Sequence, residues 1–190
     1  NNNFTWAKWV TPSRDLISAF KQEGDEVRFK ESIVYYDCNW SNYYPSDNYP
    51  FMYKCRSANS SIIKYRYADV LLLKAEALIM QDTPDLEGAA DIIDKVRDRA
   101  KLGALPTSVR SNKNAMLNAL LKERRLELAF EGQRWFDLVR LDKVEEVMNA
   151  VYAKDSGRKA QIYTFDKNSY RLPIPQSVID ANDKIHQNPG

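Results

Sequence analysis

The chain has 190 residues, and its 28 Lys and Arg against 26 Asp and Glu leave a formal net charge of only +2. This near-balance removes the main argument for a nucleic-acid-binding protein, which is a clear excess of basic residues. Apolar residues make up 44% of the chain, which is typical of a globular protein, and no apolar run approaches the roughly 20 residues that a membrane-spanning helix needs.

The first section of the chain, residues 1–62, predicts a small amount of β structure. Apolar and polar residues alternate from Val27 to Tyr35, which is typical of a strand with one buried face, and residues 50–55 are the expected partner strand. Residues 39–49 between them are rich in turn formers and predict a loop. We expect the strand aromatics to pack against the helices; these are Tyr35, Phe51 and Tyr53.

The second section, residues 63–151, predicts helices. Apolar residues recur at helical spacing in 67–79 and again in 86–100, with Thr83 as the expected N-cap and Pro84 as the first helical residue of the second helix. Such a pair has about the size of one tetratricopeptide unit and cannot bury its own apolar faces alone. A longer helix is expected over 114–131, with Gly132 as its C-cap, and residues 135–151 are expected to continue helically.

The last section, residues 152–190, is punctuated by prolines and is expected to be extended. The fold class predicted for the whole chain is therefore mainly α, with a tetratricopeptide-like helical hairpin and a small β and loop section rich in aromatic residues.

Several kinds of catalytic and cofactor chemistry are excluded by residue counts. The only histidine, His186, has nothing beside it that resembles a catalytic triad, and it is scattered from Cys38 and Cys55, so we expect no metal site of His and Cys. The six glycines form no phosphate-binding loop, and no cofactor is expected. Cys38 and Cys55 either form a disulfide, which would indicate an oxidising compartment, or are unrelated thiols, and the sequence leaves both interpretations open.

The most specific stretch is residues 122–140, KERRLELAFEGQRWFDLVR. Glu123, Glu127 and Glu131 share one helix face at spacings of four residues, where like charges repel unless cations lie between them. Consecutive turns of one helix place carboxylates poorly for a glycosidase, whose acid and base face a sugar from opposite sides. We therefore predict a structural ion-pair network rather than a catalytic site. Its remaining members are expected to be Arg124, Arg134, Arg140 and Asp137.

This stretch resembles the signature of the SusD/RagB family of outer-membrane nutrient-binding lipoproteins from Bacteroidetes. Residues 66–78 (RYADVLLLKAEAL) and 94–100 (DKVRDRA) resemble two successive helices of that family. Residues 172–176 (LPIPQ) with 187–190 (QNPG) resemble its closing segment, and residues 11–28 agree more weakly. The motifs are in the family's order and cover most of the chain.

The resemblance is to the C-terminal half of the family alone. Members are longer, carry an N-terminal helical half and begin with a signal peptide and a lipidated cysteine, and residues 1–5 (NNNFT) have none of these features. The chain is accordingly interpreted as a fragment or a processed product whose N-terminal half and lipid anchor are absent. The resemblance implies a surface-exposed position on the outer membrane and a SusC-like, TonB-dependent transporter as partner.

A ligand site is predicted from the clustering of aromatic residues. Of the 22 aromatic residues in the chain, eight fall within residues 35–53, where the average share of 12% would give about two. Sugars pack on Trp and Tyr rings and hydrogen-bond to amides and carboxylates, and one loop offers both. The predicted ligand-binding residues are Trp40, Asn42, Tyr43, Tyr44, Asp47 and Asn48, with Trp6 and Trp9 as a second platform.

The function predicted from these features is non-enzymatic capture of an oligosaccharide or polysaccharide. Peptide capture, as in RagB-type members, is the alternative within the family. A protein from another class, a helical-repeat adaptor without a small ligand, is the third interpretation. Nucleic acid is not expected as a partner, because the aromatic loop lacks the basic residues that follow a phosphate backbone.

Overall fold

The computed structural model describes residues 10–54, 63–154 and 164–188, and its contacts divide the chain into two units, Asn1–Arg134 and Trp135–Gly190. The boundaries predicted after residues 62 and 151 differ from this division. Residues on both sides of position 62 belong to the first unit, because the helix Lys113–Glu127 packs on the helix Arg14–Glu23.

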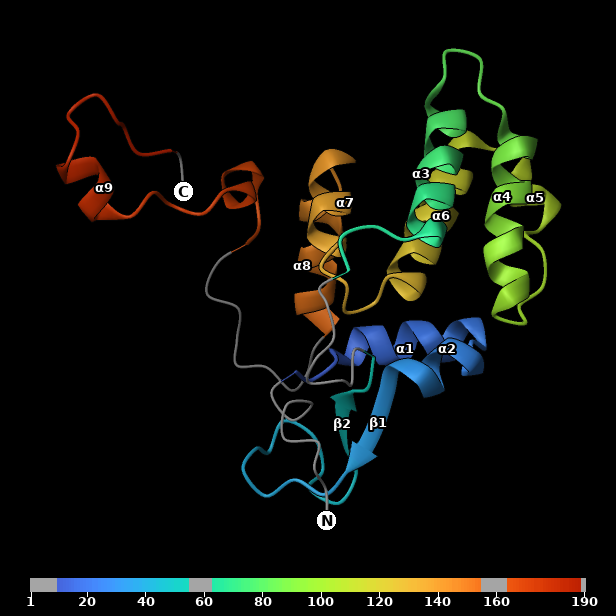
Figure 1. Cartoon of the computed structure of the whole chain (residues 1–190), viewed down its shortest axis with the longest axis horizontal. Coiled ribbons are helices and arrows are strands. Elements are labelled where there is room, and N and C mark those ends of the chain that lie inside the picture. The colour runs from blue at the N-terminus through green and yellow to red at the C-terminus, as the bar shows by residue number, and fades with distance from the viewer. Residues whose placement is uncertain (1–9, 55–62, 155–163, 189–190) are drawn as a thin grey trace. The chain divides into compact units, whose positions relative to one another are not determined.

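Unit 1 is mainly helical (Figure 1). Its elements are α1 (Arg14–Glu23), α2 (Glu26–Ser32), β1 (Ile33–Tyr36), β2 (Tyr49–Met52), α3 (Tyr67–Met80), α4 (Leu86–Arg99), α5 (Thr107–Arg110) and α6 (Lys113–Glu127). The later elements are α7 (Arg134–Arg140), α8 (Val144–Lys154), the 3₁₀ helix η2 (Lys167–Tyr170) and α9 (Gln176–Asp180). The predicted fold class, mainly α with little strand, is confirmed.

Helices α3 and α4 form the predicted helical hairpin, and α6 packs against both. The core of this bundle consists of residues such as Leu72, Ile93 and Leu120, which are completely buried. The predicted start of α4 was two residues early. Asp85, rather than Thr83, caps the helix by accepting from the Gly88 amide at 2.9 Å, and Pro84 precedes the cap.

The strand predicted from Val27 onward is wrong, because residues 26–32 form helix α2. Helix α1 ends at Glu23 and is capped by Gly24, whose φ of 69° suits a residue without a side chain, and Asp25 then caps α2 by accepting from the Arg28 amide at 3.1 Å. In the helix Val27 is exposed and Arg28 is buried, which reverses the faces that strand alternation predicted. The first β-strand begins only at Ile33.

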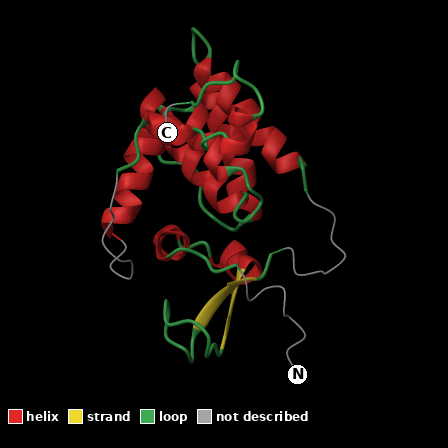
Figure 2. Ribbon diagram, turned by 90° about the vertical axis from the view of Figure 1, so that its left-hand side faces the viewer, coloured by secondary structure: helices red, strands yellow, loops and turns green. Residues whose placement is uncertain are grey.

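Strands β1 and β2 form an antiparallel hairpin, with Val34 opposite Phe51 and Tyr35 opposite Pro50. Helices α1 and α2 lie between this hairpin and the bundle of α3, α4 and α6 (Figure 1), and the two strands stand at the end of unit 1 away from that bundle (Figure 2). Tyr35 packs against the cluster of Ile17 and Phe20, as expected of a residue that faces the helices. Phe51 instead packs with Tyr49 and Cys38 on the loop side.

Helix α6 ends four residues earlier than predicted, at Glu127. Residues 128–132 form turns in which Phe130 and Gly132 have positive φ values of 66° and 79°. Glu131 therefore lies in this turn, after the end of the helix that carries Glu123 and Glu127.

The second unit contains α8 and all of α7 except its first residue, and these two helices were predicted as one. A turn separates them, and Asp142 there has a φ of 52°. The side chain of Asn149 in α8 bonds both the amide and the carbonyl of Phe165 at 2.9 Å. The closing segment predicted as extended also contains η2 and α9, and the Gln187 amide group bonds both backbone groups of Ile174. None of the helices in the described ranges combines the length and the apolar composition of a membrane-spanning segment.

Candidate functional site

The predicted ligand loop connects β1 to β2 and is called the aromatic loop here, residues 37–48. The Cys38 amide donates to the Ser46 carbonyl at 2.7 Å and closes the loop on itself. Residues 38–46 line a hollow of about 860 Å³ that is open on its outer side. This volume lies within the range of about 300–1,000 Å³ that ligand pockets typically have.

Trp40 is the exposed aromatic residue of this hollow, with 55% of its surface accessible. Its ring lies 6.0 Å from the Tyr49 ring and 6.2 Å from the Phe51 ring, and those two buried rings stack at 5.0 Å. Trp40 thus rests on a buried aromatic base while a large part of it faces solvent. Tryptophan in such a position provides a wide apolar surface at small entropic cost.

Tyr43 and Tyr44 line the same hollow but are half-buried. Their rings meet edge to face at 4.9 Å, and Tyr44 also packs edge to face on Tyr49 at 5.5 Å. The Tyr44 hydroxyl donates to the Pro12 carbonyl at 2.9 Å. Tyr44 is therefore engaged in internal packing to a degree that the sequence did not reveal.

The predicted polar residues all lie at the surface. Asn42 is exposed and lines the hollow, whereas Asp47 and Asn48, which follow the lining residue Ser46 in the chain, are exposed and do not line it. The second predicted platform, Trp6 and Trp9, lies outside the described residues. Cys55 does too, so the predicted alternatives for Cys38, whose side chain is buried, stay open.

Arg14 is the residue of this region that sequence reasoning missed. Its guanidinium carbon lies 3.9 Å from the centre of the Tyr43 ring and 4.8 Å from that of Tyr44, and the group also donates to the Tyr43 carbonyl. The residues concerned are 29 positions apart, and no local pattern indicates such a contact.

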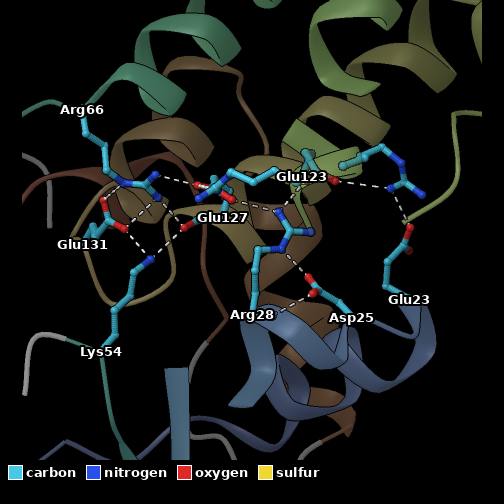
Figure 3. Close-up of polar contacts among 10 residues, drawn as sticks. Glu23, Asp25, Arg28, Lys54, Arg66, Glu123, Glu127 and Glu131 are labelled. Atoms are coloured by element: carbon cyan, nitrogen blue, oxygen red, sulfur yellow. Dashed lines mark hydrogen bonds and ion pairs between the residues drawn. The ribbon is translucent and has the colours of Figure 1, made fainter. Parts of the chain in front are cut away.

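A second feature of unit 1 is the cluster of Glu123, Glu127 and Glu131 with basic side chains, the glutamate network (Figure 3). The three carboxylate side chains are only 2–3% exposed. Arg28 Nη1 lies 2.6 Å from Glu123 and 3.1 Å from Glu127. Arg66 holds the other side of the network, with bonds of 2.6 Å to Glu127 and of 2.7 and 2.9 Å to Glu131.

Three more basic side chains complete this network. Lys54 pairs with Glu131 and donates to the Glu127 carbonyl at 2.8 Å. Arg99 pairs with Glu127, and Arg97 lies 3.3 Å from Glu123. The contacts join α6 and its following turn to α2, α4 and the segments before α3, so one cluster links parts of the chain that are up to 99 residues apart.

The cations predicted for this network occupy other places. Arg124 pairs with the buried Asp69 at 2.8 Å, Arg140 pairs with Asp137 at 2.6 Å, and Arg134 donates to the Leu121 carbonyl at 3.1 Å. Neighbouring positions on a helix point about 100° apart, so Arg124 faces α3 while Glu123 faces Arg28. The basic partners of the glutamates come mainly from distant segments, which explains why local spacing did not identify them.

The network shifts the pKa of each glutamate. Burial alone would raise the pKa of Glu127 and of Glu131, but their cationic partners outweigh it and hold both pKa values below 4.5. Arg66 acts on both glutamates, Arg99 and Arg28 act on Glu127, and Lys54 acts on Glu131. Burial raises the pKa of Glu123 above its ordinary value despite Arg28 and Arg97.

Carboxylates held in this way on one helix and its turn do not present an acid and a base to opposite faces of a sugar. Among the described residues, no cluster of His, Cys, Asp and Glu has the geometry of a metal site.

A sequence model of the SusD family matches residues 48–190, three quarters of the chain. The chain belongs to the SusD family. The resemblance inferred from the motifs is thereby confirmed. The matched residues include the last residue of the aromatic loop and α6 with its following turn, which carry the three glutamates of the network.

Relatives within the family support this assignment. The chain is 34% identical over 142 residues to SusD-like protein P2 of Formosa agariphila, and 42% identical over 99 residues to SusD-like protein P38 of the same organism. Those matches cover 71% and 49% of this chain, and 27% and 19% of the two relatives.

Solved structures show the same fold. A SusD superfamily protein from Bacteroides vulgatus superposes with a TM-score of 0.67 at 22% identity, over 94% of this chain and 44% of that protein. A protein described as a laminarin-binding SusD-like protein superposes with a TM-score of 0.59 at 26% identity, over 95% of this chain and 40% of that protein. The chain thus spans less than half the length of these SusD proteins.

Proposed function

We propose that this chain is a glycan-binding part of a SusD-family uptake protein, and that Trp40 in the aromatic loop is the centre of its site. In this proposal the protein captures an oligosaccharide or polysaccharide without converting it. It acts at the cell surface, lipid-anchored in the outer membrane, and delivers its ligand to a SusC-like, TonB-dependent transporter.

The observation that carries the proposal is the exposed Trp40 ring over the open hollow of residues 38–46. A sugar ring presents a flat C–H face that packs on such an indole, and its hydroxyls require hydrogen-bonding groups at the edge. Asn42 on the hollow supplies an amide group, and Asp47 and Asn48, exposed in the same loop, supply a carboxylate and a second amide at the surface. The named ligand of one solved relative, laminarin, is a polysaccharide, which supports the same ligand class.

The glutamate network supports a protein without hydrolytic activity. Glu127 and Glu131 have lowered pKa values and are poor proton donors near neutral pH, and Glu123 is enclosed by Arg28 and Arg97. A general acid needs a raised pKa and access to the leaving group. We expect Glu127→Gln to lower stability and to remove no hydrolysis.

The experiment that tests this function is affinity electrophoresis of the chain in gels that contain laminarin, starch or xyloglucan. We expect retardation by one glycan class, and we expect Trp40→Ala to lose it, because the variant lacks the apolar indole face on which a sugar ring packs. Tyr67→Ala is the matched control, because Tyr67 is 77% exposed but lies on α3.

Three results would argue against the proposal. Retardation that is equal for wild type and Trp40→Ala would place the site elsewhere. Binding of a peptide library, with no glycan bound, would favour the RagB-like alternative. Capture of a protein partner that Trp40→Ala leaves intact, again with no glycan bound, would favour the helical-repeat adaptor.

A further inference from the structure

We propose that Arg14 is a positioning residue that clamps the aromatic loop in the conformation presenting Trp40. Its effect on glycan binding rests on the function proposed above, whereas its effect on the loop does not. The inference follows from three features: the contacts of Arg14 with two tyrosines, its anchorage on α1, and a chain of contacts from those tyrosines to Trp40.

Arg14 contacts the aromatic loop in two ways, by cation–π stacking and by a hydrogen bond. The guanidinium carbon lies 3.9 Å from the Tyr43 ring centre and 4.8 Å from the Tyr44 ring centre, while a guanidinium N–H donates to the Tyr43 carbonyl. The two rings are inclined by 85°, so one cation serves both of them. A planar guanidinium can stack and donate at the same time, which an ammonium group cannot do equally well.

The anchor of the clamp is a well-fixed helix. Arg14 is the first residue of α1, and Ser13 caps that helix by accepting from the Leu16 amide at 3.1 Å. Further along the same helix, Ile17 and Phe20 are buried in a cluster with Leu126 and Ala129, near the end of α6. Pro12, immediately before the cap, accepts the hydroxyl bond of Tyr44. The loop is thus tied at two points to the start of α1.

Contacts lead from the clamped tyrosines to Trp40. Tyr44 packs on Tyr49 at 5.5 Å, and Trp40 packs on the same Tyr49 ring at 6.0 Å. The Tyr43 amide donates to the Ser41 hydroxyl at 3.3 Å, and that hydroxyl is 2.8 Å from the Tyr49 hydroxyl. Freeing Tyr43 and Tyr44 would therefore loosen the support on which the Trp40 ring rests. A ligand would then have to order the loop on binding, at a cost in affinity.

Hydrogen exchange of the unliganded chain tests the clamp directly. The reporters are the amides of Cys38 and Asn48, which bond the Ser46 and Pro45 carbonyls at 2.7 and 3.3 Å within the loop. In Arg14→Gln we expect these amides to exchange roughly tenfold faster, because a lost cation–π contact shifts the opening equilibrium by about that factor. Exchange in α3 and α4 should stay unchanged.

Two further variants separate the clamp from a general loss of structure. Arg14→Lys keeps the charge but not the planar group, so we expect it to accelerate exchange in the loop to a large part of the extent seen for Arg14→Gln. This variant also serves if Arg14→Gln does not fold. Arg125→Gln removes the 2.5 Å pair with Asp15, the neighbour of Arg14, and should leave exchange in the loop unchanged.

Affinity electrophoresis of the same variants in laminarin, starch and xyloglucan gels then tests the role in binding. We expect Arg14→Gln to bind roughly three- to tenfold more weakly than wild type to whichever glycan retards the wild-type chain. Unchanged exchange in the loop of Arg14→Gln and Arg14→Lys would overturn the clamp. Faster exchange with unchanged glycan affinity would overturn the role of Arg14 in binding. A wild-type chain that no glycan retards would overturn the proposed function, and the exchange data would then still test the clamp.

Discussion

At the scale of single residues, arginines from distant segments organise the interior of unit 1. Arg28 reaches Asp25, Glu123 and Glu127, and Arg66 reaches Glu127 and Glu131, so each cation connects two or more acids (Figure 3). Planar guanidinium groups suit such multiple contacts with carboxylates. Because each carboxylate is almost fully buried, the loss of one cation leaves it with fewer compensating charges in a place where water cannot replace them.

Replacing Arg66 by methionine should therefore destabilise the chain. We expect a loss of about 2–3 kcal/mol in the free energy of unfolding, below the 3–5 kcal/mol typical of a broken buried pair, because the Arg66 side chain is 25% exposed. Urea unfolding followed by circular dichroism would measure it. Lys30→Met is the matched control, since its pair with Glu26 is exposed and should contribute less than about 0.5 kcal/mol. Equal losses in the two variants would contradict a structural role for Arg66.

At the scale of elements, the helical hairpin of α3 and α4 was predictable and the first helices were not. Apolar residues at helical spacing over 14 residues leave little choice of structure in α3 and α4. Residues 26–32 are too short for periodicity to distinguish helix from strand, and the cap at Asp25 together with the buried pairs of Arg28 favours the helix. Helix α6 ends at Glu127, and Lys54 and Arg66 engage Glu131 in the turn that follows.

The hairpin depends on tight packing at its centre. Ile93 of α4 is completely buried with Leu72 and Leu120, from α3 and α6, in one cluster. We expect Ile93→Ala to cost about 2–4 kcal/mol, from lost apolar burial and the cavity left behind. Val70→Ala on the exposed side of α3 should cost less than about 0.5 kcal/mol, since Val70 is 52% exposed. Chemical denaturation of both variants would check this, and a small effect at Ile93 would show that the bundle is loosely packed.

At the scale of the whole molecule, the glutamate network makes stability depend on pH. Glu127 and Glu131 have pKa values lowered from 4.5 by folding, so their contribution is present above pH 4.5 and is lost as pH falls through their folded pKa values. Glu123 has a raised pKa in the folded chain, so its contribution has the opposite sign and is lost as pH rises through that folded pKa.

Two variants should therefore change the pH profile in opposite directions. Relative to wild type, Glu131→Gln should lose less stability on acidification below pH 4.5, because it lacks a carboxylate that must take up a proton on unfolding. Glu123→Gln should gain less stability than wild type as pH falls through the folded pKa of Glu123 toward 4.5, because it lacks a group that binds its proton more tightly when folded. Thermal unfolding at a series of pH values would measure both slopes, and parallel slopes would contradict the assigned shifts.

The mainly helical fold, the family and the choice of the aromatic loop as the candidate site could all be predicted from the amino-acid sequence. These depend on local patterns: helical periodicity, contiguous motifs and the clustering of aromatic residues in residues 35–53. Only the tertiary structure decided which residues meet. Arg14 contacts Tyr43, 29 positions away in the sequence, and Arg28 contacts Glu123, 95 positions away. Such pairings arise from the packing of whole helices, because a charge or a ring acquires its partner only when distant segments come within a few ångströms of each other.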